Sequence, residues 1–115
     1  MSEHSYDPNW KLRIVVDQTL KPGQQIAQAL HAAIEFLFVY PEQSNTWHCL
    51  SNSVVVMNCE PEELPKLLDR CKKKNVQYST FMEPDMDNRL TAVCIEPTRT
   101  GKKCTSNYKL AMRDI

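Results

Sequence analysis

The amino-acid sequence predicts an α/β domain, in which β-strands alternate with α-helices. The first observation is a short β-branched run, Leu12 to Val16, which is bounded by polar residues and is typical of a buried strand. The second is the stretch Lys21 to Tyr40, whose side chains repeat with the period of a helix. The third is the apolar run Ser53 to Met57, which indicates another buried strand. A strand that leads directly into a helix is the opening of a βα unit, so we expect helices packed on a sheet.

The next elements follow from prolines and from periodicity. Pro41 ends the long helix, because proline disfavours the α conformation of the residue before it. The polar stretch 42–52 is expected to be a connecting loop. Pro61 and the two glutamates after it mark the start of a second helix. Its apolar residues recur at the spacing of one helix face: Leu64, Leu67, Leu68 and Cys71.

The last third of the chain predicts two more strands and an uncertain tail. Val76 to Met82 and Leu90 to Ile95 are rich in β-branched and apolar residues, which is typical of strands. An acidic loop, 83–88, joins them. From residue 98 onward only a weak helical pattern is present, around Tyr108 to Met112. The tail is therefore expected to form a short docked helix or to stay mobile.

Composition indicates one compact domain over residues 11–115, preceded by a flexible lead-in over residues 1–10. The chain has 115 residues, of which 42% are hydrophobic and 24% charged, and this suits a single core. The polar start lacks the basic and apolar regions of a secretory signal. No apolar run is long enough to span a membrane, so no membrane association is expected.

The cysteines indicate a reducing environment. Five are present, an odd number that cannot be fully paired within one chain, and no two form a C-x-x-C pair: Cys49, Cys59, Cys71, Cys94 and Cys104. We expect free thiols and a cytoplasmic protein. Because the ligand spacing of a zinc site is absent, no metal is expected. Cys94 lies inside a predicted strand and is expected to be part of the core.

Charge is unevenly distributed along the chain, although the formal net charge is zero. Residues 1–65 contain three Lys/Arg and eight Asp/Glu (net −5), whereas residues 66–115 contain eleven and six (net +5). This asymmetry permits a local basic face that could meet nucleic acid, although charge alone favours a set of solvated lysines. Lysines 72–74 also suit the C-terminal end of the second predicted helix, a structural role that competes with RNA binding.

The long helical stretch carries one narrow polar stripe. Plotted at about 100° per residue, four polar side chains gather on one side: Gln24, Gln28, His31 and Glu35. The remaining circumference is so apolar that the helix is expected to be buried on nearly all sides. Polar side chains in such a helix need hydrogen-bond partners or an opening to solvent, so the stripe is the candidate functional site. The backbone N–H groups that follow Lys21 would favour an anionic ligand there.

The same stretch contains a recognisable motif. It reads A-Q-x-x-H-A from Ala27 to Ala32, after a loop that reads L-K-x-G from Leu20 to Gly23. This combination, placed directly after a strand, resembles the signature of the type II peptidyl-tRNA hydrolase family of archaea and eukaryotes. The similarity continues through Trp47, the second strand, a P-E-E-L helix opening and a last strand that ends in Glu96-Pro97. It therefore covers most of residues 11–97.

Within this superfamily the chain is most similar to a divergent branch, the peptidyl-tRNA-hydrolase-domain-containing proteins. The resemblance lies in the A-Q-A-x-H-A-A run of residues 27–33 and in the M-E-P stretch of residues 82–84. The family fold that this implies is a three-layer α/β/α domain around a four-stranded mixed sheet. The implied activity is hydrolysis of the ester that joins a nascent peptide to tRNA, releasing both, without metal or other cofactor.

The family's site residues can be carried over one by one. Lys21 matches the loop lysine and His31 the helix histidine; Glu83 lies near the acidic residue that follows the third strand, and Thr91 matches the threonine that opens the fourth. Ester hydrolysis needs an oriented water, a base, and positive charge facing the developing oxyanion. His31 would be the base or orient the water, Lys21 would contact the oxyanion or a phosphate, Glu83 would orient His31 or the water, and Thr91 would donate a hydrogen bond. Gln28 is expected to fix helix and loop geometry.

Three departures from the family pattern keep a second interpretation open. Gln24 replaces the second loop lysine, residues 83–88 replace a D-A-G-R-T-Q segment, and Asp17 stands about where the family tends to have arginine. Three cationic contacts are thus lost or reversed at a site for a polyanion. The alternative is a catalytically inactive member that binds tRNA or another nucleotide conjugate. A hydrolase redirected to a different nucleotide conjugate is a third possibility, for which the sequence has no specific sign.

Substrate contacts are expected from two regions. Gly23, Gln24 and Gln28 would bind near the reacting ester, and basic side chains would follow the phosphates of tRNA. Those basic residues lie on the second predicted helix and in the tail: Lys72, Lys73, Lys74, Arg99, Lys102, Lys103 and Lys109. Trp47 or Tyr78 could stack on the terminal adenosine. Homodimers occur in the family, so the resemblance implies that this chain could also form one.

Overall fold

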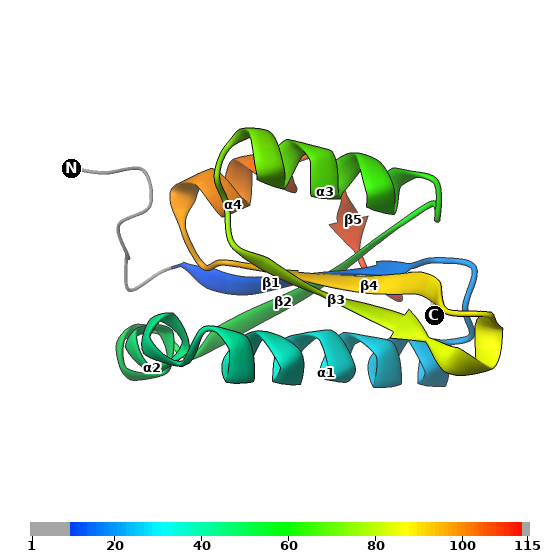
Figure 1. Ribbon diagram of the computed structural model, residues 1–115, viewed down its shortest axis with the longest axis horizontal. Helices are drawn as coiled ribbons and strands as arrows, with labels where there is room; N and C mark the ends of the chain where they lie inside the picture. Colours follow the sequence, from blue (N-terminus) through cyan, green and yellow to red (C-terminus); the bar gives the residue numbers. More distant parts are fainter. Residues whose placement is uncertain (1–9, 114–115) are drawn as a thin grey trace.

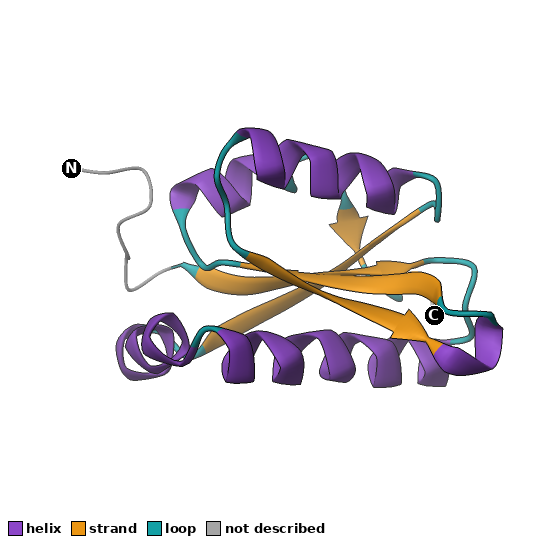
Figure 2. Ribbon diagram, viewed as in Figure 1, coloured by secondary structure: helices purple, strands orange, loops and turns teal. Residues whose placement is uncertain are grey.

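The computed structural model describes residues 10–113, so the predicted lead-in over residues 1–10 lies almost entirely outside the described part. A mixed β-sheet is sandwiched between two helical layers, with α1 and α2 on one face and α3 and α4 on the other (Figure 1). Helices and strands alternate as the sequence predicts (Figure 2). The elements are, in chain order, β1 (Lys11–Asp17), α1 (Pro22–Val39), α2 (Pro41–Leu50), β2 (Ser53–Cys59), α3 (Glu63–Lys73), β3 (Tyr78–Glu83), η1 (Pro84–Met86), β4 (Arg89–Ile95), α4 (Arg99–Cys104) and β5 (Lys109–Leu110).

The sheet has the strand order β3-β4-β1-β2-β5. β1 and β2 are parallel, whereas β4 runs antiparallel to both β1 and β3. β1, β2 and β3 therefore point the same way, and their last residues are Asp17, Cys59 and Glu83. The side of the sheet at which these three strands end is called the carboxyl edge. α1 and β4 begin at this same edge (Figure 1). Carboxyl edges of parallel strands are a common place for ligand sites in α/β domains.

Each face of the sheet has its own apolar core. Side chains of β1 alternate between the two, because successive residues of a strand point to opposite faces. Leu12, Ile14 and Val16 pack with Phe36 of α1, whereas Val15 packs with Leu67 of α3. Cys94 is fully buried on the α1 side, which confirms its predicted core position. All five cysteines are free thiols, as predicted, and Cys49 is exposed whereas the other four are buried.

The prediction that α1 is buried on nearly all sides is wrong. Its buried residues form one face against the sheet: Gln25, Gln28, Ala29, Ala32 and Phe36. The opposite face is apolar and open to solvent, and its side chains are exposed by 38–81%: Ile26, Leu30, Ile34, Leu37 and Phe38. The physical reason is that α1 forms an outer layer, with a sheet on one side only (Figure 1). Periodicity identified the polar stripe and left open how many layers cover the helix.

The prediction that residues 42–52 form a loop is also wrong, because they contain helix α2. Proline is compatible with the first turn of a helix, so Pro41 both ends α1 and begins α2. The helix is fixed by Trp47, which is 8% exposed and donates its indole N–H to the Ser53 carbonyl at 2.8 Å. This contact with the start of β2 compensates for a weakly patterned sequence.

The tail forms a helix and a fifth strand, so the prediction of four strands is one too few. α4 begins after Thr98, whose hydroxyl accepts a hydrogen bond from the Gly101 N–H at 3.1 Å. The weak helical pattern around residues 108–112 is overridden, because β5 pairs with Met57 and Asn58 of β2. A two-residue strand gains its order from this partner and carries no local signal. Within residues 10–113 no helix combines the length and apolar character that a membrane crossing requires.

The two phenylalanines of α1 test this arrangement. Phe36 is fully buried and Phe38, two residues away, is 81% exposed. Phe36→Ala is expected to lower the free energy of unfolding by about 3–5 kcal/mol because it leaves a cavity under α1. Phe38→Ala is expected to change it by no more than about 0.5 kcal/mol. Urea unfolding at submicromolar protein measures both, and equal losses would contradict the outer-layer position of α1.

Candidate active site

A buried amide joins three elements at the carboxyl edge of the sheet. Gln28, on the inner face of α1, is 4% exposed. Its Nε2 donates a hydrogen bond to Glu83 Oε1 at 3.0 Å, at the end of β3. Its Oε1 accepts a hydrogen bond from the Thr91 hydroxyl at 2.7 Å, in β4. Both ends of the amide are thereby fixed, and two of the predicted catalytic residues are brought to one point.

Thr91 reaches this point because β4 is irregular there. Phe81 of β3 pairs with Ala92, but the next residue, Met82, pairs with Leu90, so the register passes over Thr91. Such a β-bulge turns a side chain that strict alternation would send to the other face. Ala92 packs in the core on the α1 side, and Thr91 joins it on that side through its bond to Gln28. Thr91 is fully buried, so it can act on the site only through its hydrogen bond to Gln28.

His31 lies one turn after Gln28 on α1 and is exposed to solvent. Its imidazole stacks on the ring of Phe81, with centroids 4.3 Å apart and an interplanar angle of 12°. The stack holds the ring at the boundary between α1 and β3, where a ligand can reach it. Among the described residues, Glu83 is hydrogen-bonded to Gln28 and not to His31. The second carboxylate oxygen of Glu83 therefore stays available for a water or a ligand.

Lys21 and Gln24 lie at the open start of α1. Lys21 is the residue before the helix, and its backbone N–H donates to Gln24 Oε1 at 3.1 Å. A side chain at Gly23 would meet nothing within 4 Å, so the first turn is open to a ligand. Lys21 precedes Gln28 by two turns of helix, about 10 Å at the usual rise. The Lys21 side chain is exposed, and only an extended ligand would contact both ends of this stretch.

Lysines 72–74 lie elsewhere. Lys72 and Lys73 are in the last turn of α3 and Lys74 is its C-cap residue. α3 is on the opposite face of the sheet from α1 (Figure 1). The end of α3 is also at the opposite edge from Glu83, because α3 runs back against the parallel strands. β1 has seven residues, so the two edges are separated by about 20 Å. These lysines cannot contact the same chemical group as His31.

Neither aromatic residue proposed for base stacking is at this edge. The indole of Trp47 is buried and hydrogen-bonded to Ser53, which makes its role structural. Tyr78 is half-buried against the core on the α3 side, at the start of β3. The aromatic side chain that the site does contain is Phe81, which sequence reasoning missed. Its position in β3, two residues before Glu83, is the signal that could have identified it.

A second missed feature is an ion pair beside the site. Asp17, fully buried at the end of β1, pairs with Arg89 at the start of β4. Asp17 Oδ1 also accepts hydrogen bonds from the Thr19 N–H at 2.8 Å and from its hydroxyl at 2.6 Å. Arg89 donates to the Thr19 hydroxyl at 3.0 Å. Arg89 is opposite Glu83 in the strand register. The network of Asp17, Thr19 and Arg89 therefore lies beside the site and fixes the start of β4.

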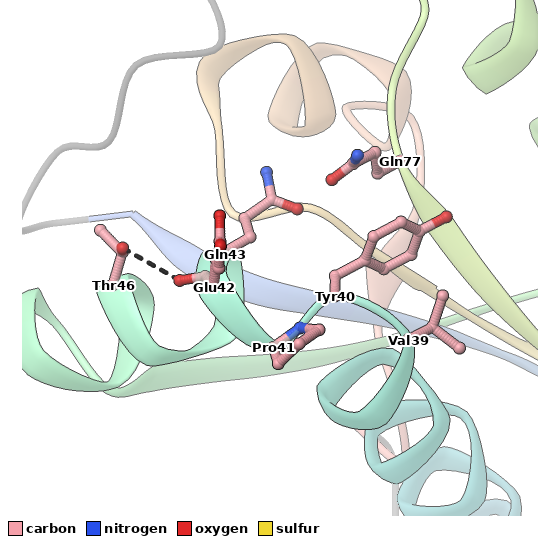
Figure 3. A pocket seen from close by; sticks show the side chains of 7 residues that line it. All are labelled: Val39, Tyr40, Pro41, Glu42, Gln43, Thr46 and Gln77. Atoms are coloured by element: carbon pink, nitrogen blue, oxygen red, sulfur yellow. Dashed lines mark hydrogen bonds between the residues drawn. The ribbon is translucent and has the colours of Figure 1, made fainter.

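A cavity of about 630 Å³ is distant from these residues. It lies where α1 meets α2, at the other end of α1 from Lys21 (Figure 3). Its lining residues are Val39, Tyr40, Pro41, Glu42, Gln43, Thr46 and Gln77. None of them is a predicted site residue, and we do not assign catalysis to this cavity. In residues 10–113 no group of three or more His, Cys, Asp or Glu side chains is arranged to hold a metal ion.

Comparison with known protein families shows to which family the chain belongs. The model of the family described as peptidyl-tRNA hydrolase PTH2 matches residues 10–111. The chain belongs to the PTH2 family. A solved protein of unknown function from Agrobacterium tumefaciens strain C58 has a similar fold, with a TM-score of 0.67 and 16% sequence identity over 87% of this chain and 96% of that one. No curated protein sequence matches significantly.

In this PTH2 member a tight loop, residues 84–88, joins β3 to β4. Pro84–Met86 forms a single 3-10 turn, and Asp87 and Asn88 then adopt left-handed backbone conformations, with φ of 54° and 59°. Aspartate and asparagine tolerate this conformation better than most residues. The tight turn brings Arg89 back opposite Glu83. The loop that replaces the family's segment is therefore ordered and shapes the edge of the site.

The Thr91 hydroxyl can be tested by stability. Thr91→Val leaves the buried Gln28 Oε1 without its donor, and we expect a loss of about 1–3 kcal/mol in the free energy of unfolding. Thr91→Ser keeps the hydroxyl and is expected to retain most of that energy. Urea denaturation of the two variants and the wild type measures the difference. If serine and valine destabilise equally, the hydrogen bond to Gln28 contributes nothing.

Proposed function

We propose that this chain hydrolyses the ester bond of peptidyl-tRNA. The observation that carries the proposal is the hydrogen-bonded series Thr91, Gln28 and Glu83 at the carboxyl edge of the sheet, next to the exposed His31. It supplies a carboxylate with a fixed orientation and a histidine that a ligand can reach. Membership of the PTH2 family supports the same activity.

The proposed reaction is direct attack of water on the ester carbonyl. The oxygen of water bonds to the carbonyl carbon, and one of its protons passes to His31. The bond between that carbon and the ribose oxygen then breaks, and the proton is returned to the ribose oxygen as tRNA leaves. Glu83, held on one side by Gln28, orients the water through its other oxygen. Thr91 keeps Gln28, and through it Glu83, in place.

Positive charge for a substrate phosphate is proposed to come from Lys21, because about two turns of helix separate it from Gln28 and the reacting ester. Lys21 is exposed at the start of α1, where backbone N–H groups of the first turn also favour an anion. Gln24 and Gly23 would bind the substrate in the same turn, Gln24 with an uncharged amide. The carboxylate of Asp17, which stands where the family tends to have arginine, is neutralised by Arg89. Its negative charge therefore repels a polyanion little.

The partner is proposed to be tRNA in the cytoplasm, which would place the protein in translation. Lys72, Lys73 and Lys74, at the C-terminal end of α3, would contact phosphates about 20 Å from the reacting ester, as a stem of double-stranded RNA allows. Such contacts would add affinity without choice of sequence, and they would weaken with salt. They supply none of the chemistry at His31.

Single-turnover release of tRNA from N-blocked aminoacyl-tRNA tests the activity. His31→Ala is expected to slow release by about 10²–10⁴-fold, the usual contribution of a positioned base. Lys21→Ala is expected to slow it by roughly 10- to 100-fold at subsaturating enzyme, as for loss of a charge-assisted contact to a substrate phosphate. The matched controls are His48→Ala, an exposed histidine of α2, and Lys11→Ala at the far edge of the sheet. Both controls should keep the wild-type rate.

Other outcomes of this experiment separate the rival functions. If the wild type releases tRNA no faster than buffer yet binds it in a salt-dependent way, the chain is a binding module and the hydrolase proposal fails. If His31→Ala retains the wild-type rate, the assignment of the base is wrong. If neither release nor binding of tRNA occurs, the family relationship carries the fold and not the function.

A homodimer is proposed through the exposed apolar face of α1. The face runs from Ile26 to Phe38, and its middle lies between Leu30 and Ile34. A twofold axis there would pair two α1 helices in antiparallel fashion and place Lys21 of each copy toward Glu42 of the other. Opposite charges flanking a shared apolar face favour this self-association over a partner of one charge.

Sedimentation of the wild type and of Leu30→Glu tests the dimer. Leu30 is 58% exposed at the middle of this face. The wild type is expected to sediment as a dimer at tens of micromolar, and Leu30→Glu as a folded monomer, because a dimer would bury two carboxylates face to face. A monomeric wild type at that concentration would contradict the proposal.

A further inference from the structure

A small cavity lies between α3 and α4. These two helices cover the face of the sheet opposite α1 (Figure 1). Its volume is about 230 Å³, below the usual range for a whole drug-sized ligand. It is lined by Arg70, Lys73, Lys74, Thr100, Lys103 and Cys104. Four of these six side chains are cationic, and no acidic side chain is among them. The cavity is therefore suited to a small anion.

One of the cations is held in a fixed orientation. Arg70 Nε donates a hydrogen bond to the Cys104 carbonyl at 3.2 Å, and its Nη2 donates to the Tyr108 hydroxyl. The guanidinium carbon also lies 5.5 Å from the centre of the Tyr108 ring. These contacts leave the guanidinium partly engaged and limit its movement. The lysines of the cavity lie at the exposed rim and can adjust to a ligand.

Thr100 lines this cavity and has a buried hydroxyl whose hydrogen-bonding capacity is unused. The residue is 3% exposed, and within the part of the chain that the structure describes its hydroxyl oxygen has no hydrogen-bond partner. Buried hydroxyls are nearly always hydrogen-bonded, so an unsatisfied one suggests a partner that binds from outside. A hydroxyl can donate its proton to an anion. It adds a directional donor to the positive charge.

The rest of the surroundings does not oppose an anion. Burial raises the pKa of Cys71 to about 12 and also raises that of Cys104, so both thiols are uncharged near neutral pH. The nearby carboxylate is Glu96, which is buried and accepts hydrogen bonds from the Gln77 N–H at 2.6 Å and from the Thr98 hydroxyl at 2.6 Å. Its oxygens are thus already bonded to other donors.

The packing of α4 defines the shape of the cavity. A Cβ at Gly101 would lie 2.3 Å from the Glu96 carbonyl oxygen, so the helix approaches the end of β4 as closely as only glycine permits. Thr98 caps the same helix through the Gly101 N–H. The position of Thr100 relative to α3 is therefore set by local geometry and not by the ligand.

We propose that the cavity between α3 and α4 binds a single phosphate group. Arg70 and the lysines would neutralise its charge, and the Thr100 hydroxyl would donate a hydrogen bond to one of its oxygens. The site is remote from His31 and has no part in ester hydrolysis. The phosphate can belong to an RNA backbone or to a small phosphorylated molecule, since the recognised chemistry is the same.

Adjacent lysines of α3 provide a matched test. Lys73 lines the cavity, whereas Lys72 lines a different one beside Tyr40. Inorganic phosphate is titrated into the full chain at low ionic strength, and the backbone amide shifts are followed by NMR. Lys73→Gln is expected to weaken binding about five- to tenfold, and Lys72→Gln less than twofold. Thr100→Val is expected to weaken it about fivefold, because a directional donor is lost.

Several results would overturn the proposal. If Lys72→Gln and Lys73→Gln weaken binding equally, the phosphate follows diffuse surface charge and the cavity is not a site. The same conclusion follows if shifts are absent around Thr100 and Cys104 at saturating phosphate. Lys73→Gln changes an exposed residue and should fold normally, so a folding defect in Thr100→Val leaves the test decisive.

A second arm identifies the source of the phosphate. A fluorescent RNA hairpin is titrated into the wild type and Lys73→Gln, with and without competing inorganic phosphate. An RNA ligand predicts weaker hairpin binding in Lys73→Gln and competition by phosphate, whereas equal hairpin binding assigns the site to a small phosphorylated molecule. His31→Ala should bind phosphate like the wild type. Failure of the hydrolase proposal and failure of this one are therefore distinguishable.

Discussion

The arrangement of the site depends on the buried amide of Gln28. An amide that is 4% exposed must find partners for both its N–H and its carbonyl oxygen, and here they come from two different strands. Satisfying it requires Glu83 at the end of β3 and a β-bulge that turns Thr91 toward α1. One hydrogen-bonding requirement thus docks the helix, explains an irregular strand and fixes the carboxylate beside His31.

The three-layer architecture places the candidate catalytic residues far from the basic cavity. The candidate catalytic residues lie in the layer of α1 at the carboxyl edge of the sheet, and the basic cavity lies between α3 and α4 in the opposite layer. A strand length, about 20 Å, and the thickness of the sheet lie between them. The lysines of α3 and α4 therefore cannot stabilise an oxyanion at His31. They can act only on a ligand large enough to reach both layers, or on a second ligand.

Features of the fold and of the candidate site could be predicted from the sequence where residues close together in the chain form the pattern. The strands and α1 were recognisable because their apolar residues repeat within a few positions, and His31 and Gln28 followed from one helical stripe. The exposed face of α1, helix α2 and strand β5 were not, because each depends on what packs or fails to pack against it. The direction of Thr91 depends on a register shift, and the pair Asp17 and Arg89 joins residues 72 positions apart. No local pattern encodes such contacts.

The ion pair of Asp17 and Arg89 bears on whether the departures from the family pattern abolish activity. Counted along the sequence, an aspartate in place of an arginine reverses a charge at a site for a polyanion. In the folded chain the aspartate is fully buried and paired, while the arginine side chain is 40% exposed at the same edge. The pair is neutral, and its accessible end is the positive one. Asp17 therefore adds no net negative charge at this edge, whereas neither Gln24 nor the segment 83–88 supplies a cation of its own.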